Sequence, residues 1–136
     1  MKILVRTSTL AIAWMLFYLV ADQVSTSRGD ANIGLGLLAF GLLLVGAGIW
    51  GVVDGSRHAF SQVAITWVSV AVFMGLLVPV FTALTESGFS WRVLLLDMLG
   101  TGPFMAALVA GPALLGAAFG TAMGSSRRDD RRAGPA

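Results

Sequence analysis

The sequence has no cysteine, one histidine and few charged residues, and each shortage removes a class of function. Without cysteine the chain has no disulfide, thiolate nucleophile or cysteine-ligated metal. The single histidine, His58, has no second imidazole for bis-histidine haem ligation within this chain. No serine, histidine and acid occur with the spacing of a catalytic triad motif. The sequence therefore predicts a protein that is not an enzyme, with no cofactor or metal site.

The shortage of charge also excludes an ordinary soluble domain. Charged residues make up 12% of the chain and apolar residues 57%, whereas about a quarter of the residues of a soluble domain are charged. With a mean hydropathy of +0.85, the chain cannot cover the wet surface of a soluble fold of this size. A lipid bilayer is the expected solvent. The basic residues gather at the chain ends, which indicates membrane topology and not nucleic-acid binding.

Uncharged stretches show where the chain is expected to cross the membrane. A helix needs roughly 20 residues to span about 30 Å of hydrocarbon, and residues 33–53, 60–84 and 98–124 supply such stretches. A further segment, residues 7–24, has a shorter apolar core and spans only if Lys2 and Arg6 snorkel to the surface. Its alternative is a signal peptide cleaved after Ala21, although Leu19 is bulky for that pattern. We predict an all-α membrane protein, a bundle of four transmembrane helices.

The basic residues predict that both chain ends are cytoplasmic. With the N-terminus inside, seven Lys and Arg residues lie on the inner side and two on the outer side, as the positive-inside rule requires. Eight Arg against one Lys, with abundant Ala and Gly, favour a GC-rich bacterial genome and hence a bacterial cytoplasmic (inner) membrane. The inner residues are Lys2, Arg6, Arg57, Arg127, Arg128, Arg131 and Arg132, and the outer residues are Arg28 and Arg92.

The last hydrophobic stretch, residues 93–124, is too long for one simple crossing. It would extend about 48 Å as a helix and require an unusually steep tilt. We predict a break near Gly100 to Pro103, with Pro103 in the first turn of a helix that crosses over residues 103–124. Residues 90–99 would form an interfacial segment or a short extra helix. Residues 1–126 form one transmembrane domain, and residues 127–136 a disordered basic cytoplasmic tail.

Asp97 is the main candidate for chemistry, because an acid within a hydrophobic stretch is a functional candidate by default in membranes. It could bind a proton or a cation beside the break at Pro103, as at the broken helices of transporters. Alternatively, Asp97 reaches interfacial water or pairs with Arg92, five residues earlier.

Small residues predict two helix-packing faces, because helices in lipid associate through close van der Waals contact. One face repeats every seven residues and the other forms a doubled GxxxG pattern. Both faces could be used inside the bundle, or one could face a second subunit. The first consists of Gly34, Gly41 and Gly48, and the second of Gly116, Gly120 and Gly124.

The third hydrophobic stretch carries a polar stripe and a kink signal. Gln62, Thr66 and Ser69 share one face and either join helices or line an aqueous path. Pro79 is expected to kink the helix, with room for its ring at Gly75. Contacts to anionic headgroups are expected from Arg57, His58, Arg127 and Arg128.

These patterns leave two hypotheses. The first is a non-enzymatic accessory or assembly subunit that packs through glycine-rich faces against other membrane-protein subunits or a second copy of itself. It rests on these faces and on the expected absence of charge pairs within the membrane. The alternative is a small oligomeric transporter or proton or cation conduit that uses Asp97 and the broken fourth helix.

Overall fold

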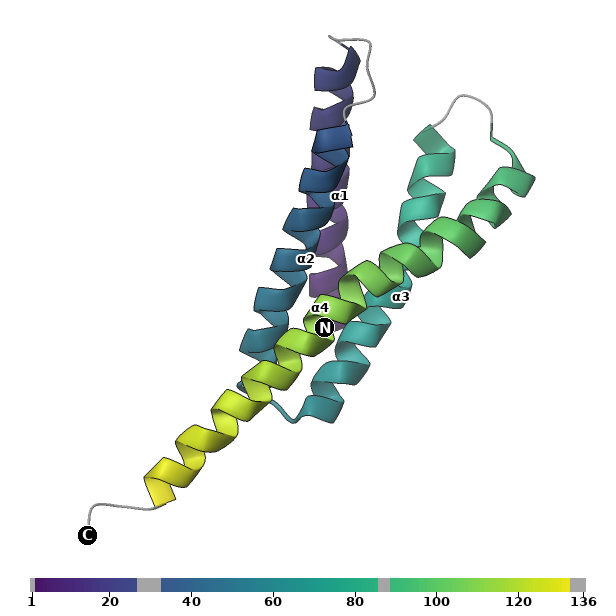
Figure 1. Ribbon diagram of the computed structural model, residues 1–136. Coiled ribbons are helices and arrows are strands. Elements are labelled where there is room, and N and C mark those ends of the chain that lie inside the picture. The colour runs from purple at the N-terminus through teal and green to yellow at the C-terminus, as the bar shows by residue number, and fades with distance from the viewer. Residues whose placement is uncertain (1, 27–32, 86–88, 133–136) are drawn as a thin grey trace.

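The computed structural model describes residues 2–26, 33–85 and 89–132, in which all regular structure is helical. The four helices are α1 (Lys2–Thr26), α2 (Ile33–Gly55), α3 (Phe60–Thr85) and α4 (Trp91–Arg132) (Figure 1). Each contains a segment long and apolar enough to cross a membrane. The predicted all-helical chain with four helices of spanning length is confirmed. The helix α1 runs through Ala21, where the alternative interpretation put a cleavage site.

Consecutive helices run in opposite directions (Figure 1). Arg6, near the start of α1, pairs with Asp54, near the end of α2. Thr121, late in α4, donates a hydrogen bond to the carbonyl of Gly55. The start of α1, the turn between α2 and α3, and the later part of α4 therefore lie at one end of the molecule, called here the Asp54 end.

The predicted break in the last hydrophobic stretch is wrong, because α4 is one uninterrupted helix of 42 residues. It contains both Pro103 and Pro112, and each proline removes only one backbone hydrogen bond. A full break would expose several backbone groups, which lipid cannot satisfy. The unbroken α4 runs diagonally across α2 and α3 (Figure 1).

The helix α4 also continues as far as Arg132. Residues 127–132 are thus helical where the sequence predicted a disordered tail, and Arg is a good helix former. Residues 133–136, the loop residues Arg28 and Glu86, and the side chains of Arg127 and Arg128 lie outside the part of the chain that the structure describes.

Glycine lets α2 and α4 approach backbone to backbone at the Asp54 end. A Cβ atom added to Gly116 would collide with the carbonyl oxygen of Gly48, and one added to Gly120 would collide with that of Val52. The contact is reciprocal, since a Cβ on Gly51 would meet the backbone of Ala113. Such close approach gives the dense van der Waals contact that holds helices together in lipid.

The other predicted glycine face is placed differently. Gly48 takes part in the contact with α4 through its carbonyl oxygen, which a Cβ atom on Gly116 would strike, whereas a Cβ atom added to Gly48 itself would lie 3.7 Å from the carbonyl oxygen of Pro112. A Cβ atom added to Gly41 would have no described neighbour within 4 Å, and Gly34 is exposed. The helix α4 crosses α2 obliquely and meets it from Gly48 through Gly51 to Gly55, so that of the three predicted glycines only Gly48 belongs to the contact.

The helices α3 and α4 cross at a second glycine contact. A Cβ on Gly75 would lie 2.6 Å from the carbonyl oxygen of Gly102 and 3.3 Å from the Cβ of Ala106. Gly75 therefore makes room for α4, whereas the sequence suggested that it makes room for the ring of Pro79. Both Gly75 and Pro79 are buried within a continuous α3.

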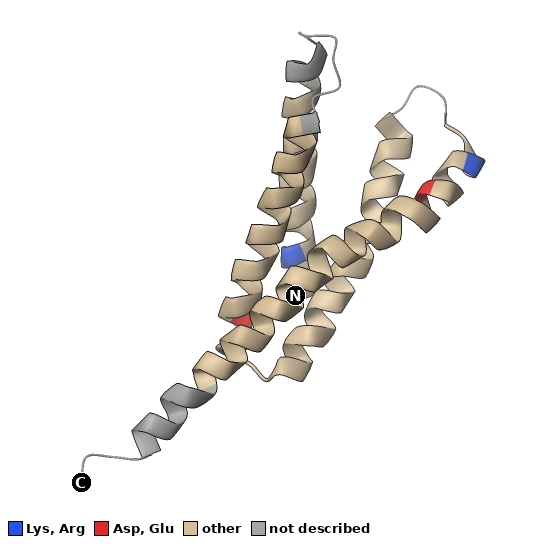
Figure 2. Cartoon of the chain, in the orientation of Figure 1, with Lys and Arg blue, Asp and Glu red and all other residues tan. Residues whose placement is uncertain are grey.

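The core lies where α3 meets α4, and its largest fully buried side chains are Trp67 and Met74 of α3. Outside it, large apolar side chains such as Leu16, Leu37 and Leu115 are more than half exposed. Most of the helical ribbon in Figure 2 has the colour of uncharged residues, and many of the large side chains exposed on it are apolar. Such a surface is suited to acyl chains and unsuited to water.

Candidate functional site

A buried ion pair joins the first three helices at the Asp54 end. Nη2 of Arg6 donates to Oδ1 of Asp54, and each side chain is only 9% exposed. The other carboxylate oxygen, Oδ2, accepts a hydrogen bond from Nε1 of Trp67 at 3.0 Å. The expectations that Arg6 snorkels to the surface and that no such charge pair exists are wrong. A charge at this depth is costly alone but tolerated when paired and hydrogen-bonded.

Two indole rings flank the guanidinium of Arg6. Its Cζ lies 5.9 Å from the centroid of the Trp50 ring and 5.7 Å from that of Trp67. The rings meet edge to face, with centroids 6.0 Å apart. Cations are attracted to the faces of aromatic rings, so the two tryptophans help to hold Arg6 in place.

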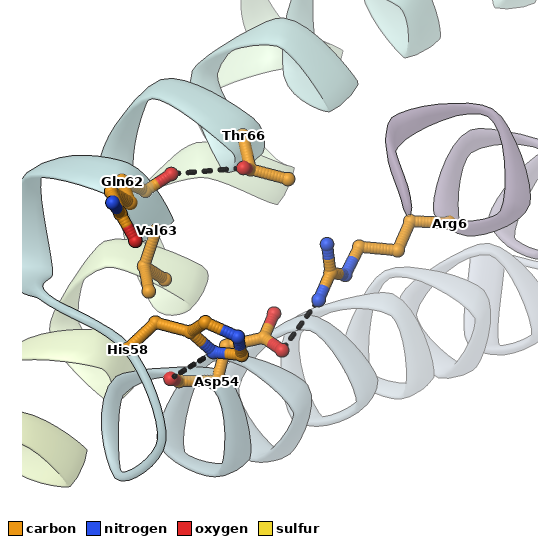
Figure 3. Close-up of a pocket in the computed structure, with 6 residues that line it drawn as sticks. All are labelled: Arg6, Asp54, His58, Gln62, Val63 and Thr66. Atoms are coloured by element: carbon orange, nitrogen blue, oxygen red, sulfur yellow. Dashed lines mark hydrogen bonds and ion pairs between the residues drawn. The ribbon is translucent and has the colours of Figure 1, made fainter. Parts of the chain in front are cut away.

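A polar pocket of about 190 Å³ opens beside the ion pair (Figure 3). His58 and Gln62 form its outer part and are exposed, whereas Arg6 and Asp54 form its buried part. The His58 ring lies over the end of α2, with Nδ1 3.3 Å from the carbonyl oxygen of Asp54. The lining consists of Arg6, Asp54, His58, Gln62, Val63 and Thr66.

The structure divides the predicted polar stripe. Gln62 and Thr66 line the pocket, and Ser69 does not. The hydroxyl of Thr66 donates to the carbonyl of Gln62 at 2.9 Å, and that of Ser69 to the carbonyl of Ile65 at 2.8 Å. Both hydroxyls thus satisfy themselves on their own helix, and neither donates to another helix among the described residues.

The donor capacity of Arg6 is not fully used. Its Nε is buried and has no hydrogen-bond partner among the described residues. The same holds for the hydroxyl of Thr7. The guanidinium of Arg6 makes no hydrogen bond within the described ranges except the one to Asp54. A buried unsatisfied donor is costly, so the unused N–H groups of Arg6 favour an acceptor that is not part of this chain.

Asp97 lies far from this pocket, near the start of α4. Its side chain is partly buried, and no hydrogen bond or ion pair joins it to another described residue, Arg92 included. Within the described ranges no three His, Asp or Glu side chains are grouped so that they could hold a metal ion. The structure does not bring Asp97 together with the other predicted polar residues.

Arg57 is exposed on the turn at the Asp54 end, outside the pocket lining, whereas His58 belongs to the lining. Sequence reasoning missed the importance of Arg6, Asp54 and Trp67. Two signals could have found them. Arg6 and Asp54 are opposite charges at the ends of apolar stretches that lie on the same predicted side, and a deep tryptophan needs a partner for its N–H group.

A second, apolar groove of about 300 Å³ lies between α1 and α2. Along it Trp14 of α1 stacks on Phe40 of α2 with ring centroids 5.8 Å apart. Gly46 is on the α2 side, and a Cβ atom added to it would have no described neighbour within 4 Å. The groove is lined by Thr9, Leu10, Ala13, Trp14, Phe17, Ala39, Leu42, Leu43, Gly46 and Trp50.

No known protein family, curated protein or solved structure matches this chain. The geometry of the polar pocket and the apolar groove is therefore the basis on which a function is assigned. What it establishes by itself is a small helical protein with four apolar helices, each of membrane-spanning length.

Proposed function

We propose that this protein is a non-enzymatic accessory or assembly subunit, which packs through its apolar groove against a transmembrane helix of another membrane protein. The observation that carries the proposal is the groove between α1 and α2. We place the protein in a bacterial cytoplasmic membrane with both ends inside, following the distribution of Lys and Arg. A reporter fused to the C-terminus checks this orientation and should be active only in the cytoplasm.

The lining of the groove specifies the chemistry of its partner. Of its ten residues only Thr9 carries a hydroxyl, and the indole N–H groups of Trp14 and Trp50 are the other side-chain donors. The hydroxyl of Thr9 already donates to the carbonyl of Val5 at 2.8 Å. An apolar, uncharged helix is therefore the matching occupant, and Gly46 permits the close approach that such packing needs.

The glycine-rich face of α4 is not available for this role. Gly116 and Gly120 face α2 within the chain, so they hold this protein together. On a helical wheel Gly41 points away from the groove, and it offers a second surface on α2 for comparison.

A conduit based on Asp97 has less support. The half-helix that would have begun at Pro103 is part of a continuous α4. Asp97 and the polar pocket lie at opposite ends of the described helices, and Thr66 and Ser69 use their hydroxyls on their own helix. The conduit hypothesis can be tested directly. If it is correct, Asp97→Asn should abolish proton or cation flux in proteoliposomes.

Site-specific photocrosslinking in cell membranes tests the subunit proposal. A crosslinker at Leu42, which lines the groove and is 59% exposed, should give one discrete protein adduct. The matched control is Leu37 on the opposite face of α2, which is 66% exposed and should give none. An adduct of twice the chain mass identifies a second copy as the occupant. Lipid adducts alone from Leu42 would overturn the proposal.

Substitutions that fill the groove sharpen the test. Gly46→Leu should remove the Leu42 adduct, because Gly46 lines the groove and a Cβ atom added to it has no described neighbour within 4 Å, so that the leucine side chain can enter the groove. Gly41→Leu, equally free of neighbours within 4 Å, should leave the adduct unchanged. Loss of the adduct with Gly41→Leu but not with Gly46→Leu would place the partner on the other face of α2 and contradict the groove.

A further inference from the structure

We propose that the polar pocket at the Asp54 end binds a phosphate group, supplied either by a lipid headgroup or by free phosphate. This site is separate from the apolar groove and does not depend on the function proposed for it. The argument rests on the unused hydrogen-bond donors of the pocket, its charge, its size and its depth.

Most side-chain groups of the pocket that can still form a hydrogen bond are donors. Both oxygens of the Asp54 carboxylate already accept hydrogen bonds, one from Arg6 and one from Trp67. Arg6 uses only Nη2 within the described ranges, and its Nε is buried without a partner. Figure 3 shows the guanidinium at the pocket, with one terminal nitrogen bound to Asp54 and the other on the side of Thr66. A guanidinium with spare N–H groups suits the oxygens of phosphate.

The outer residues of the lining extend this donor set. The side-chain amide of Gln62 makes no hydrogen bond with the described residues, and Gln62 lines the same pocket as Arg6 (Figure 3). His58, the remaining titratable residue of the lining, lies beside Asp54 (Figure 3). Among the described residues Asp54 is the only acid that lines the pocket, and its charge is already matched by Arg6. An incoming phosphate therefore meets amide and guanidinium donors and no unpaired carboxylate.

The size and position of the pocket also match a phosphate group. Its volume of about 190 Å³ is more than ten times the roughly 10–15 Å³ of cavity that one water molecule needs, so it has room for a group larger than water. Asp54 is the last residue but one of α2, and Gln62 is in the first turn of α3. The pocket thus opens where the helices leave the membrane, which is the depth of lipid headgroups.

Binding measurements on the full chain in detergent test the site. The probes are inorganic phosphate, dihexanoyl phosphatidic acid and, as the uncharged reference, dihexanoyl glycerol, each titrated by calorimetry. We expect at least one phosphate probe to bind and the reference not to bind. Tighter binding of the lipid assigns the site to headgroups, and equal or tighter binding of inorganic phosphate assigns it to the free ion. If neither phosphate probe binds, the proposal is wrong.

Three variants locate the binding. Gln62→Leu leaves the ion pair intact and should weaken binding at least tenfold, because a hydrogen bond to a charged ligand is lost. Arg6→Gln should abolish it. The matched control is Arg57→Gln, an exposed cation on the neighbouring turn that does not line the pocket, and it should change affinity less than twofold. If Arg57→Gln weakens binding as much as Gln62→Leu does, the binding is general surface attraction and the pocket is not the site. Unchanged binding in both Gln62→Leu and a folded Arg6→Gln would also overturn it.

Discussion

The helices α4 and α1 are attached to the rest of the molecule in opposite ways. The helix α4 meets α2 and α3 through backbone atoms at Gly116, Gly120 and Gly102, where a single added carbon atom would collide. The helix α1 is attached through side chains, chiefly the ion pair of Arg6 and stacked aromatic rings. At the first interface backbone atoms are in close contact, whereas a groove and a pocket lie beside the second.

This difference indicates which helix contacts hold the fold together and which leave space for binding. Glycine contacts bring α4 against α2 and α3 with backbone atoms close together. Side-chain contacts attach α1, and the groove and the polar pocket lie beside it. Four substitutions test this division, from the largest expected effect to the smallest.

Gly120→Leu should have the largest effect. Its side chain would collide with the carbonyl of Val52 and the backbone nitrogen of Ser56, neither of which can move without shifting a whole helix. We expect a loss of more than about 3 kcal/mol in the free energy of unfolding, at or beyond the upper end for overpacking. Unfolding by sodium dodecyl sulfate, followed by circular dichroism, measures it. The control Gly41→Leu should be within about 0.5 kcal/mol of the wild type. Equal stability of the two variants would contradict the close contact of α2 with α4.

Arg6→Met should have the next largest effect, since it leaves the buried carboxylate of Asp54 without its cation. Removal of one partner of a buried pair costs about 3–5 kcal/mol, and we expect the lower end because the pocket is open on one side. The double variant Arg6→Met with Asp54→Leu should recover at least half of that loss, because no charge is left unpaired. If the double variant loses the sum of the two single losses, the residues do not act as a pair.

Trp67→Phe should have a smaller effect. It keeps most of the fully buried aromatic surface but removes the donor to Oδ2 of Asp54. A hydrogen bond to a charged group contributes about 1.5–3 kcal/mol, and the same unfolding titration should show a loss near the lower value. Trp14→Phe, whose ring stacks on Phe40 without a hydrogen bond to a described residue, is the control and should lose less. A larger loss from Trp14→Phe would show that packing outweighs this hydrogen bond.

Gly46→Leu should leave stability almost unchanged, within about 0.5 kcal/mol. No described atom lies within 4 Å of the added Cβ. In the unfolding titration this variant should therefore resemble Gly41→Leu, although only Gly46→Leu fills the groove. A clear destabilisation would mean that a side chain in the groove disturbs the packing of α1 on α2. The attachment of α1 would then be as intolerant of added atoms as the attachment of α4.

Hydropathy and length predicted the four helices because both are local properties of the chain. The boundaries at Gly55 and Phe60 follow from the polar turn between two apolar stretches. The continuity of α4 could not be predicted from its own residues, because proline and glycine at 100–103 favour a break locally. It depends on the neighbouring helix, where Gly75 accepts the close approach of Gly102.

The candidate site was harder to predict for the same reason. Each charge of the Arg6 and Asp54 pair sits at the end of an apolar stretch, where a residue is ordinarily at the membrane surface. Only the antiparallel packing of α1, α2 and α3 shows that both are buried and face Trp67. The sequence identified Gln62 and Thr66 as polar neighbours on one helix face. It could not show that they share a pocket with Arg6, because Arg6 belongs to a different helix.

The unbroken α4 has a further consequence for the behaviour of the protein in membranes of different thickness. Its apolar part, Trp91–Gly124, has 34 residues, which is about 51 Å of helix against about 30 Å of hydrocarbon. This hydrophobic mismatch is relieved by inclination of the helix or by local thickening of the lipid around it. Since α4 is locked to both α2 and α3, a change of bilayer thickness acts on the angle between those two helices as well.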